Sequence, residues 1–146
     1  ALRQALKMLA PVRDDFRLAD YSTSFNWAHD HLPHRPPGDL SWYAVVFRSR
    51  RKADCNNVDL FEADRLAYTE AFANTNGALL VYWYTGLDKD SNCLATCVWA
   101  SRGHAVSVSS LPAHKDAARL SAGSYVHYKI DRQRIEWLPE ESKLQV

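Results

Sequence analysis

The feature that most constrains this chain is a set of segments in which both alternating series of residues, the odd-numbered and the even-numbered, are apolar or aromatic. In residues 79–85, Tyr82 and Tyr84 alternate with Val81 and Trp83. Residues 42–48 are similarly rich in aromatic and β-branched side chains. Successive side chains of a strand point to opposite faces of its sheet, and a large bare apolar face is unstable in a monomer. A sheet built from these strands therefore needs cover on both of its faces.

The order of the segments predicts how one face is covered. Strands are expected at 42–48, 79–85, 93–99 and within 126–138, and helices at 58–74, 102–110 and 112–122. Asn57 is expected to cap the first of these helices and Asn76-Gly77 to end it, while the polar turn at 86–92 makes the next two strands an antiparallel hairpin. The order β-α-β-β-α-β predicts an α+β, ferredoxin-like fold with two helices on one sheet face. We expect a second copy to cover the other face, which gives a dimeric α+β barrel and a homodimer.

The ends of the chain are predicted to lie outside this domain. The 146 residues fit a single domain, which we place at 41–138, after an irregular N-terminal extension over 1–40 with a short helix near its start. Residues 139–146 are expected to be a C-terminal tail. The extension has neither the apolar core nor the cleavage site of a secretory signal.

Charge and cysteine content exclude several classes of protein. A net charge of +1 gives no field to attract nucleic acid or an anionic membrane, and no run of residues is long and apolar enough to span a bilayer. Cys93 and Cys97 on one strand would lie about 13 Å apart, too far for a disulfide. An odd number of thiols favours a reducing, cytoplasmic location.

Several of these segments carry a resemblance to a known family. Residues 42–49, 63–65, 82–84 and 93–99, with Pro112, His114 and Tyr125, resemble a family of small uncharacterised fungal proteins. This resemblance covers roughly residues 22–138. It implies a fungal origin but no activity.

A looser resemblance links Trp99, followed by Ser101 at a helix start, to the dimeric α+β barrels of the antibiotic-biosynthesis monooxygenase type. That superfamily includes cofactor-independent oxygenases, polyketide cyclases, lactone isomerases and haem-degrading enzymes, with ligands between sheet and helices. The haem-degrading members have a Trp within the second helix and a His ten residues beyond it. In this chain the corresponding positions, counted from Trp99, hold Val108 and Ala118. The resemblance therefore disfavours haem degradation by that route.

Two titratable residues are the main catalytic candidates. Asp64 shares a helix face with Leu60, Ala67 and Ala71, where a carboxylate is costly unless it is paired. It is either a catalytic acid or base with a raised pKa or a member of a structural ion pair or hydrogen bond, with Arg48 or a strand tyrosine as its partner. His114 follows Pro112 at a helix start and could abstract a proton near neutral pH, or simply pack there.

The other candidates are expected to bind substrate. They are Arg48, which could neutralise an anion or pair with Asp64 or Glu70, and the aromatic and histidine side chains of Tyr68, Tyr82, Tyr84, Trp99 and His104. Tyr84 is also assigned a catalytic role in orienting a carbonyl, and the alternative for these aromatic residues is an ordinary hydrophobic core or a dimer interface. His127 is a weaker candidate.

Metal and cofactor sites are not expected. His29, Asp30, His31 and His34 crowd a proline-rich loop without a second cluster of ligands, and Cys93 and Cys97 have the character of small hydrophobic side chains. The sequence thus predicts a cofactor-independent enzyme of fungal secondary metabolism. It would isomerise, cyclise or dehydrate an apolar, polyketide- or terpenoid-like metabolite by proton transfer. The alternatives are a cofactor-independent or haem-linked monooxygenase and a non-catalytic ligand-binding dimer.

Overall fold

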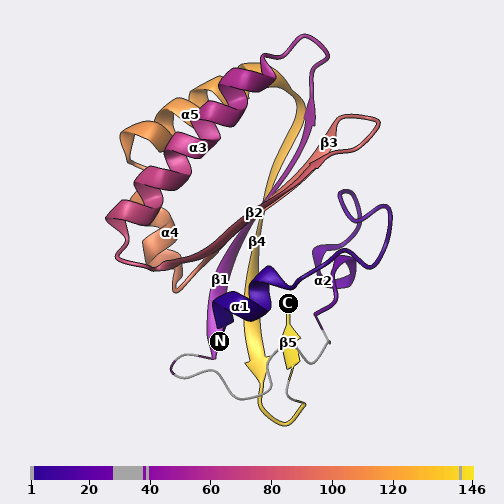
Figure 1. Cartoon of the computed structure of the whole chain (residues 1–146), viewed down its shortest axis with the longest axis vertical. Helices are drawn as coiled ribbons and strands as arrows, with labels where there is room; N and C mark the ends of the chain where they lie inside the picture. The colour runs from indigo at the N-terminus through magenta and orange to yellow at the C-terminus, as the bar shows by residue number, and fades with distance from the viewer. Residues whose placement is uncertain (1, 28–37, 39, 142) are drawn as a thin grey trace.

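In the part of the chain that the structure describes, five antiparallel strands form one sheet. The computed structural model describes residues 2–27, 38, 40–141 and 143–146. The strand order is β2-β3-β1-β4-β5 (Figure 1). The strands are β1 (Ser41–Arg51), β2 (Leu79–Leu87), β3 (Asn92–Trp99), β4 (Tyr125–Leu138) and β5 (Lys143–Gln145). The first four confirm the predicted α+β, ferredoxin-like arrangement.

The short strand β5 was not predicted. Residues 139–146 were expected to be a tail, but Leu144 pairs with Trp137 of β4 and is buried in the core. A three-residue strand has too short a pattern to be detected in the sequence. Strand β5 forms because β4 extends to Leu138, and the last residues of β4 leave backbone groups with which β5 pairs.

Three helices lie on one side of the sheet, which we call the helix-facing side (Figure 1). They are α3 (Asn57–Asn74), α4 (Arg102–Val108) and α5 (Pro112–Ser124). Asn56, not Asn57, caps α3 by accepting from the backbone N–H groups of Val58 and Asp59. The helix ends before Asn76 and Gly77, whose positive φ angles of 47° and 83° reverse the chain. Among the described residues, no helix is both long and apolar enough to cross a membrane.

The opposite side of the sheet is covered by residues 2–27, which we call the N-terminal segment. It contains α1 (Leu2–Lys7) and α2 (Tyr21–Ser24). Its largest buried side chains are Leu6, Phe16, Tyr21, Phe25 and Trp27. They form one core cluster with residues of the sheet that include Trp42, Val46, Val98 and Ile135. The expectation that this face would be bare is therefore wrong, because aromatic residues scattered among polar ones over residues 16–27 supply its cover from within the same chain.

The helix-facing side is covered less completely. A small core of Ala71, Leu79, Trp99 and Val108 lies at one end of it. Further along, Tyr84 of β2 and Tyr128 and Ile130 of β4 remain 40%, 44% and 37% exposed. The register pairs Tyr128 with Ser49 and Ile130 with Phe47, which places both β4 residues on this side. This half of the sheet presents aromatic side chains that the helices leave accessible.

Candidate active site

Asp64 and Tyr82 form the centre of the candidate site. Asp64 lies on α3 and Tyr82 on β2, and the Tyr82 hydroxyl donates a short hydrogen bond to the Asp64 carboxylate. The contact places Tyr82 on the helix-facing side, as strand alternation predicts. The Tyr68 ring, one turn along α3 from Asp64, lies 5.7 Å from the ring of Tyr82. Three of the predicted site residues are thus brought together.

His114 approaches from the start of α5. Glu70 of α3 accepts hydrogen bonds from the backbone N–H groups of Ala113 and His114, so a side chain from another helix caps α5. The Glu70 carboxylate is 3.9 Å from Nδ1 of His114, too far for a hydrogen bond. Nδ1 is buried and has no hydrogen-bond partner among the residues that the structure describes. Glu70 thus fixes the backbone at His114, while Nδ1 of the imidazole remains unsatisfied.

The two titratable groups are shifted in opposite directions. Burial raises the pKa of the Asp64 carboxyl, against a smaller lowering by the Tyr82 hydrogen bond and by the charges of His114 and Arg51. Burial lowers the pKa of His114, against the raising effect of the Glu70 and Asp64 charges. Both shifts disfavour the charged forms. Asp64 remains solvent-accessible as a residue, and its carboxyl combines a raised pKa with a hydrogen bond from Tyr82, a combination typical of acid–base sites.

Arg51, which the sequence did not single out, extends the site along the sheet. Its Nη2 donates to the Tyr84 hydroxyl at 3.1 Å, and its guanidinium carbon is 5.9 Å from the centre of the Tyr84 ring. Beside it, the rings of Tyr125 and Tyr128 stack at 5.3 Å. Strand alternation could have identified Arg51, because it shares a strand parity with Tyr43 and Phe47.

Arg48 lies on the opposite face of the sheet, so its predicted pairing with Asp64 or Glu70 is wrong. It shares a strand parity with Trp42 and Val46, which face the N-terminal segment. Its guanidinium binds three backbone carbonyls of that segment and forms an ion pair with Asp131. The three-residue separation of Arg48 and Arg51 on one strand puts them on opposite faces.

The remaining candidates lie apart from Asp64. Trp99 is buried in the helix-facing core with Val108, where it serves as core and not as an accessible ligand contact. Nδ1 of the exposed His104 lies 2.9 Å from the Ser101 hydroxyl at the start of α4. His127 pairs in register with Arg50 and faces the same side as Arg48.

Cysteine and metal chemistry find no support in the described part of the chain. Burial raises the pKa of the Cys93 thiol and of the Cys97 thiol, which disfavours the reactive thiolate. No group of three or more metal-ligating side chains occurs among the described residues. The predicted loop cluster of His29, Asp30, His31 and His34 lies outside these residues.

Comparison with solved structures supports the fold. A candidate antibiotic biosynthesis monooxygenase from Nitrosomonas europaea matches with a TM-score of 0.56 and 11% identity, over 67% of this chain and 93% of that one. A second such candidate, from Caulobacter crescentus, matches with a TM-score of 0.55 and 12% identity, over 68% of this chain and 92% of the other. A conserved protein from Methanosarcina mazei matches with a TM-score of 0.54 and 12% identity, over 64% of this chain and 91% of that one. At these identities the likeness concerns the fold alone.

Comparison of sequences identifies a family. The UPF0643 protein PB2B2.08 of Schizosaccharomyces pombe is 30% identical over an alignment of 152 positions, which covers 92% of this chain and 67% of the relative. This agrees with the fungal resemblance of the strands and of the Asp64 and His114 segments. The PB2B2.08-like family model matches residues 1–146, and the chain therefore belongs to the PB2B2.08-like family.

Proposed function

We propose that this protein is a small enzyme that moves protons on an apolar, carbonyl-bearing metabolite bound against the helix-facing side of the sheet. The reaction class is isomerisation, cyclisation or dehydration, without a redox cofactor. A role in fungal secondary metabolism, on polyketide- or terpenoid-like compounds, is part of this proposal. One observation carries it: His114, whose pKa is lowered by burial, interacts through charge with Asp64, a carboxyl hydrogen-bonded by Tyr82.

In this mechanism His114 is the general base. A lowered pKa keeps the imidazole neutral near pH 7, so that it can take a proton from the carbon next to a substrate carbonyl. The electron pair of the broken C–H bond moves onto the carbonyl oxygen, which becomes an enolate. The negative charges of Glu70 and Asp64 stabilise the resulting imidazolium. Return of the same proton to a different carbon completes an isomerisation with no net oxidation or reduction of the substrate.

Arg51 and Tyr84 are proposed to stabilise the enolate oxygen. Their side chains are already hydrogen-bonded to each other, and a guanidinium near a developing oxyanion lowers the energy of the transition state. This assigns to Arg51 the role that the sequence suggested for Arg48. The half-exposed rings of Tyr68, Tyr84 and Tyr128 provide apolar contact area for a flat substrate.

Proton abstraction is tested without the natural substrate by deuterium exchange. The probe is 1-tetralone in D₂O, and NMR follows loss of the proton signals next to its carbonyl. We expect the wild-type protein to accelerate exchange and His114→Gln to lower the rate by about 100-fold or more. Asp64→Asn should also reduce it, whereas Asp116→Asn, an exposed carboxylate on α5, should leave it unchanged.

Two results would reject the assignment. One is exchange with the wild-type protein that is no faster than in buffer. The other is full exchange activity in both His114→Gln and Asp64→Asn, with far-UV circular dichroism showing that each variant is folded. Loss of activity in Asp116→Asn as well would indicate a general effect on the fold and not on the site.

A monooxygenase is the second candidate function. It is favoured by the solved structures from Nitrosomonas europaea and Caulobacter crescentus, which are described as candidate antibiotic biosynthesis monooxygenases. An oxygen electrode distinguishes the two. Consumption of O₂ with an aromatic phenol or quinol as probe supports oxygenation, whereas exchange without O₂ consumption supports proton transfer alone.

The homodimer stays a prediction, as does a cytoplasmic location. The argument for a dimer was a bare sheet face, and the N-terminal segment covers much of that face. Light scattering coupled to size exclusion measures the mass directly. Twice the chain mass of 16.6 kDa supports the dimer, and the mass of a single chain rejects it.

A further inference from the structure

A separate cavity lies on the other side of the sheet, beneath the N-terminal segment. Its volume is about 370 Å³, within the roughly 300–1,000 Å³ usual for small-molecule sites. One wall is the chain from Arg17 to Tyr21, and the sheet contributes the other. The lining residues from the sheet are Arg48, Ser49, Asn92, His127, Lys129, Asp131 and Gln133. The Asp64 site is on the opposite face and shares none of these residues.

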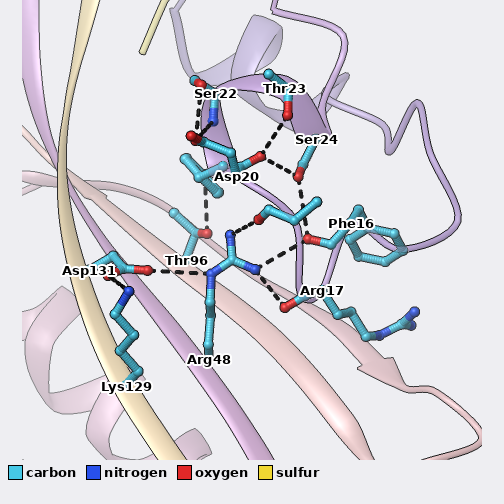
Figure 2. A network of polar contacts seen from close by, with 12 residues as sticks. Phe16, Arg17, Asp20, Ser22, Thr23, Ser24, Arg48, Thr96, Lys129 and Asp131 are labelled. Carbon is cyan, nitrogen blue, oxygen red and sulfur yellow. Dashed lines mark hydrogen bonds and ion pairs between the residues drawn. The ribbon is translucent and has the colours of Figure 1, made fainter.

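The wall of this cavity is held by specific contacts. The guanidinium of Arg48 donates hydrogen bonds to the carbonyls of Phe16, Arg17 and Ala19, at 3.3, 2.5 and 2.6 Å (Figure 2). Arg48 is only 9% exposed. The hydroxyl of Tyr21 adds a buried hydrogen bond to Thr96 of β3, at 3.1 Å. The cavity is therefore bounded by a fixed segment and not by a loose loop.

The charges around the cavity are unequal. The Asp131 carboxylate is shared between Arg48, at 3.4 Å, and Lys129, at 2.8 Å (Figure 2). One carboxylate thus faces two cations. The other acid in the lining, Asp20, accepts hydrogen bonds from the backbone N–H and hydroxyl of Ser22 and is turned toward α2. Arg17 adds a third cation to the lining, although its guanidinium donates to the carbonyls of Thr85 and Gly86.

Lys129 is the cation best placed to bind a ligand, in addition to its ion pair with Asp131 at 2.8 Å. Arg48 uses its donors on the N-terminal segment and on Asp131, so it contributes charge and not a free donor. The side chain of Lys129 is 60% exposed and carries three N–H donors. His127 and Gln133 lie on the same strand face at two-residue spacings and add further polar groups to the lining. A partly enclosed site with excess positive charge attracts anions more strongly than open solvent would allow.

From this arrangement we propose that the cavity binds a small anionic metabolite with a carboxylate or phosphate group. Lys129 donates to the anion, His127, its neighbour on the same strand face, contacts the rest of the polar group, and Arg48 supplies positive charge from behind while it fixes the N-terminal segment. The site stands independently of the proposed acid–base function, because the two lie on opposite faces of the sheet and use different residues.

Isothermal titration calorimetry at low ionic strength tests the proposal, with citrate as the carboxylate probe and inorganic phosphate as the other. We expect saturable binding of at least one probe to the full chain. Lys129→Gln removes the charge and keeps a polar side chain one bond shorter than that of lysine, and it should weaken binding by about tenfold. The matched control Lys115→Gln, on exposed α5, should bind as the wild type does. The probe that binds identifies the chemical group.

Three outcomes would overturn it. Absence of saturable binding for both probes excludes an anion site. Equal binding by wild type and Lys129→Gln, or equal weakening in Lys115→Gln, shows only general attraction to surface charge. Because Lys129 is exposed, the variant is expected to fold, and an unchanged unfolding midpoint in urea verifies this. A second variant, His127→Gln, should weaken binding by less than Lys129→Gln.

Discussion

The two faces of the sheet differ in how their buried polar groups are hydrogen-bonded. On the side of the N-terminal segment, Arg48 has its donors bound by carbonyls and Asp131, and Tyr21 is bound to Thr96. On the helix-facing side, Nδ1 of His114 is buried without a partner and Asp64 has a pKa raised by burial. Among the described residues, the first face has one buried side-chain nitrogen without a partner, Nε1 of Trp137, whereas the helix-facing side retains two, Nδ1 of His114 and Nε of Arg51.

This difference indicates which face supplies stability and which is suited to chemistry. Buried polar groups stabilise a fold only when they are hydrogen-bonded. Unsatisfied or shifted groups cost free energy and are typical of functional sites. Substitutions on the N-terminal side should therefore affect folding most, and substitutions of Asp64 or His114 should affect folding little.

The largest effect is expected for Arg48→Ala. The substitution leaves three carbonyls without their partner and Asp131 with Lys129 as its remaining cation, and removal of one member of a buried ion pair costs about 3–5 kcal/mol. Urea unfolding measures the free energy. Arg50→Ala, at an exposed position two residues along β1, should change it by less than about 0.5 kcal/mol. Equal effects of the two variants would contradict the assigned role of Arg48.

A smaller loss is expected for Tyr21→Phe. It removes the buried hydroxyl that donates to Thr96 and should cost about 1–2 kcal/mol. Tyr84→Phe removes a hydrogen bond to Arg51 on the exposed helix-facing side and should cost less. Combining Tyr21→Phe with Thr96→Val in a double-mutant cycle isolates the pair. A coupling energy near zero would show that this hydrogen bond does not stabilise the segment.

The stability of the Asp64→Asn variant relative to the wild type should increase as the pH rises above about 4. Because the folded pKa of Asp64 is raised, the folded state holds this proton more tightly than the unfolded chain does. Wild-type stability is then lost as the pH rises from the unfolded to the folded pKa. Asp15→Asn should show the opposite sign, since Arg13 lowers the pKa of Asp15. Unfolding curves between pH 3 and pH 7 compare the two variants. If the stability of both, relative to wild type, changes with pH in the same direction, the raised pKa of Asp64 is refuted.

The smallest effect is expected for His114→Gln. Since burial lowers the folded pKa of His114, the unfolded chain binds the proton more tightly. Wild-type stability relative to the variant should rise with pH up to about 6.5, the ordinary pKa of histidine, and stay constant above it. NMR titration of the imidazole gives the pKa itself. A value at or above the ordinary one would remove the basis for a neutral general base.

Much of this arrangement was readable from the sequence because it depends on local periodicity. Alternation in β2 correctly placed Tyr82 and Tyr84 opposite Val81 and Trp83, and helical spacing placed Asp64 beside Leu60, Ala67 and Ala71. Ser101 was correctly expected to cap α4. The role of Arg48 was missed, although its parity with Trp42 already assigned it to the other face.

The order of strands and helices, and hence the ferredoxin-like fold, followed from the sequence alone, because a buried strand or helix face imposes its period on consecutive residues. Three features required the tertiary structure: residues 2–27 covering the second face, Glu70 capping α5, and Arg48 joining the carbonyls of residues 16–19 to Asp131. Each joins groups more than 25 residues apart in the chain. Such contacts follow from how the elements pack, and no local pattern encodes which distant carbonyl or carboxylate a side chain will meet.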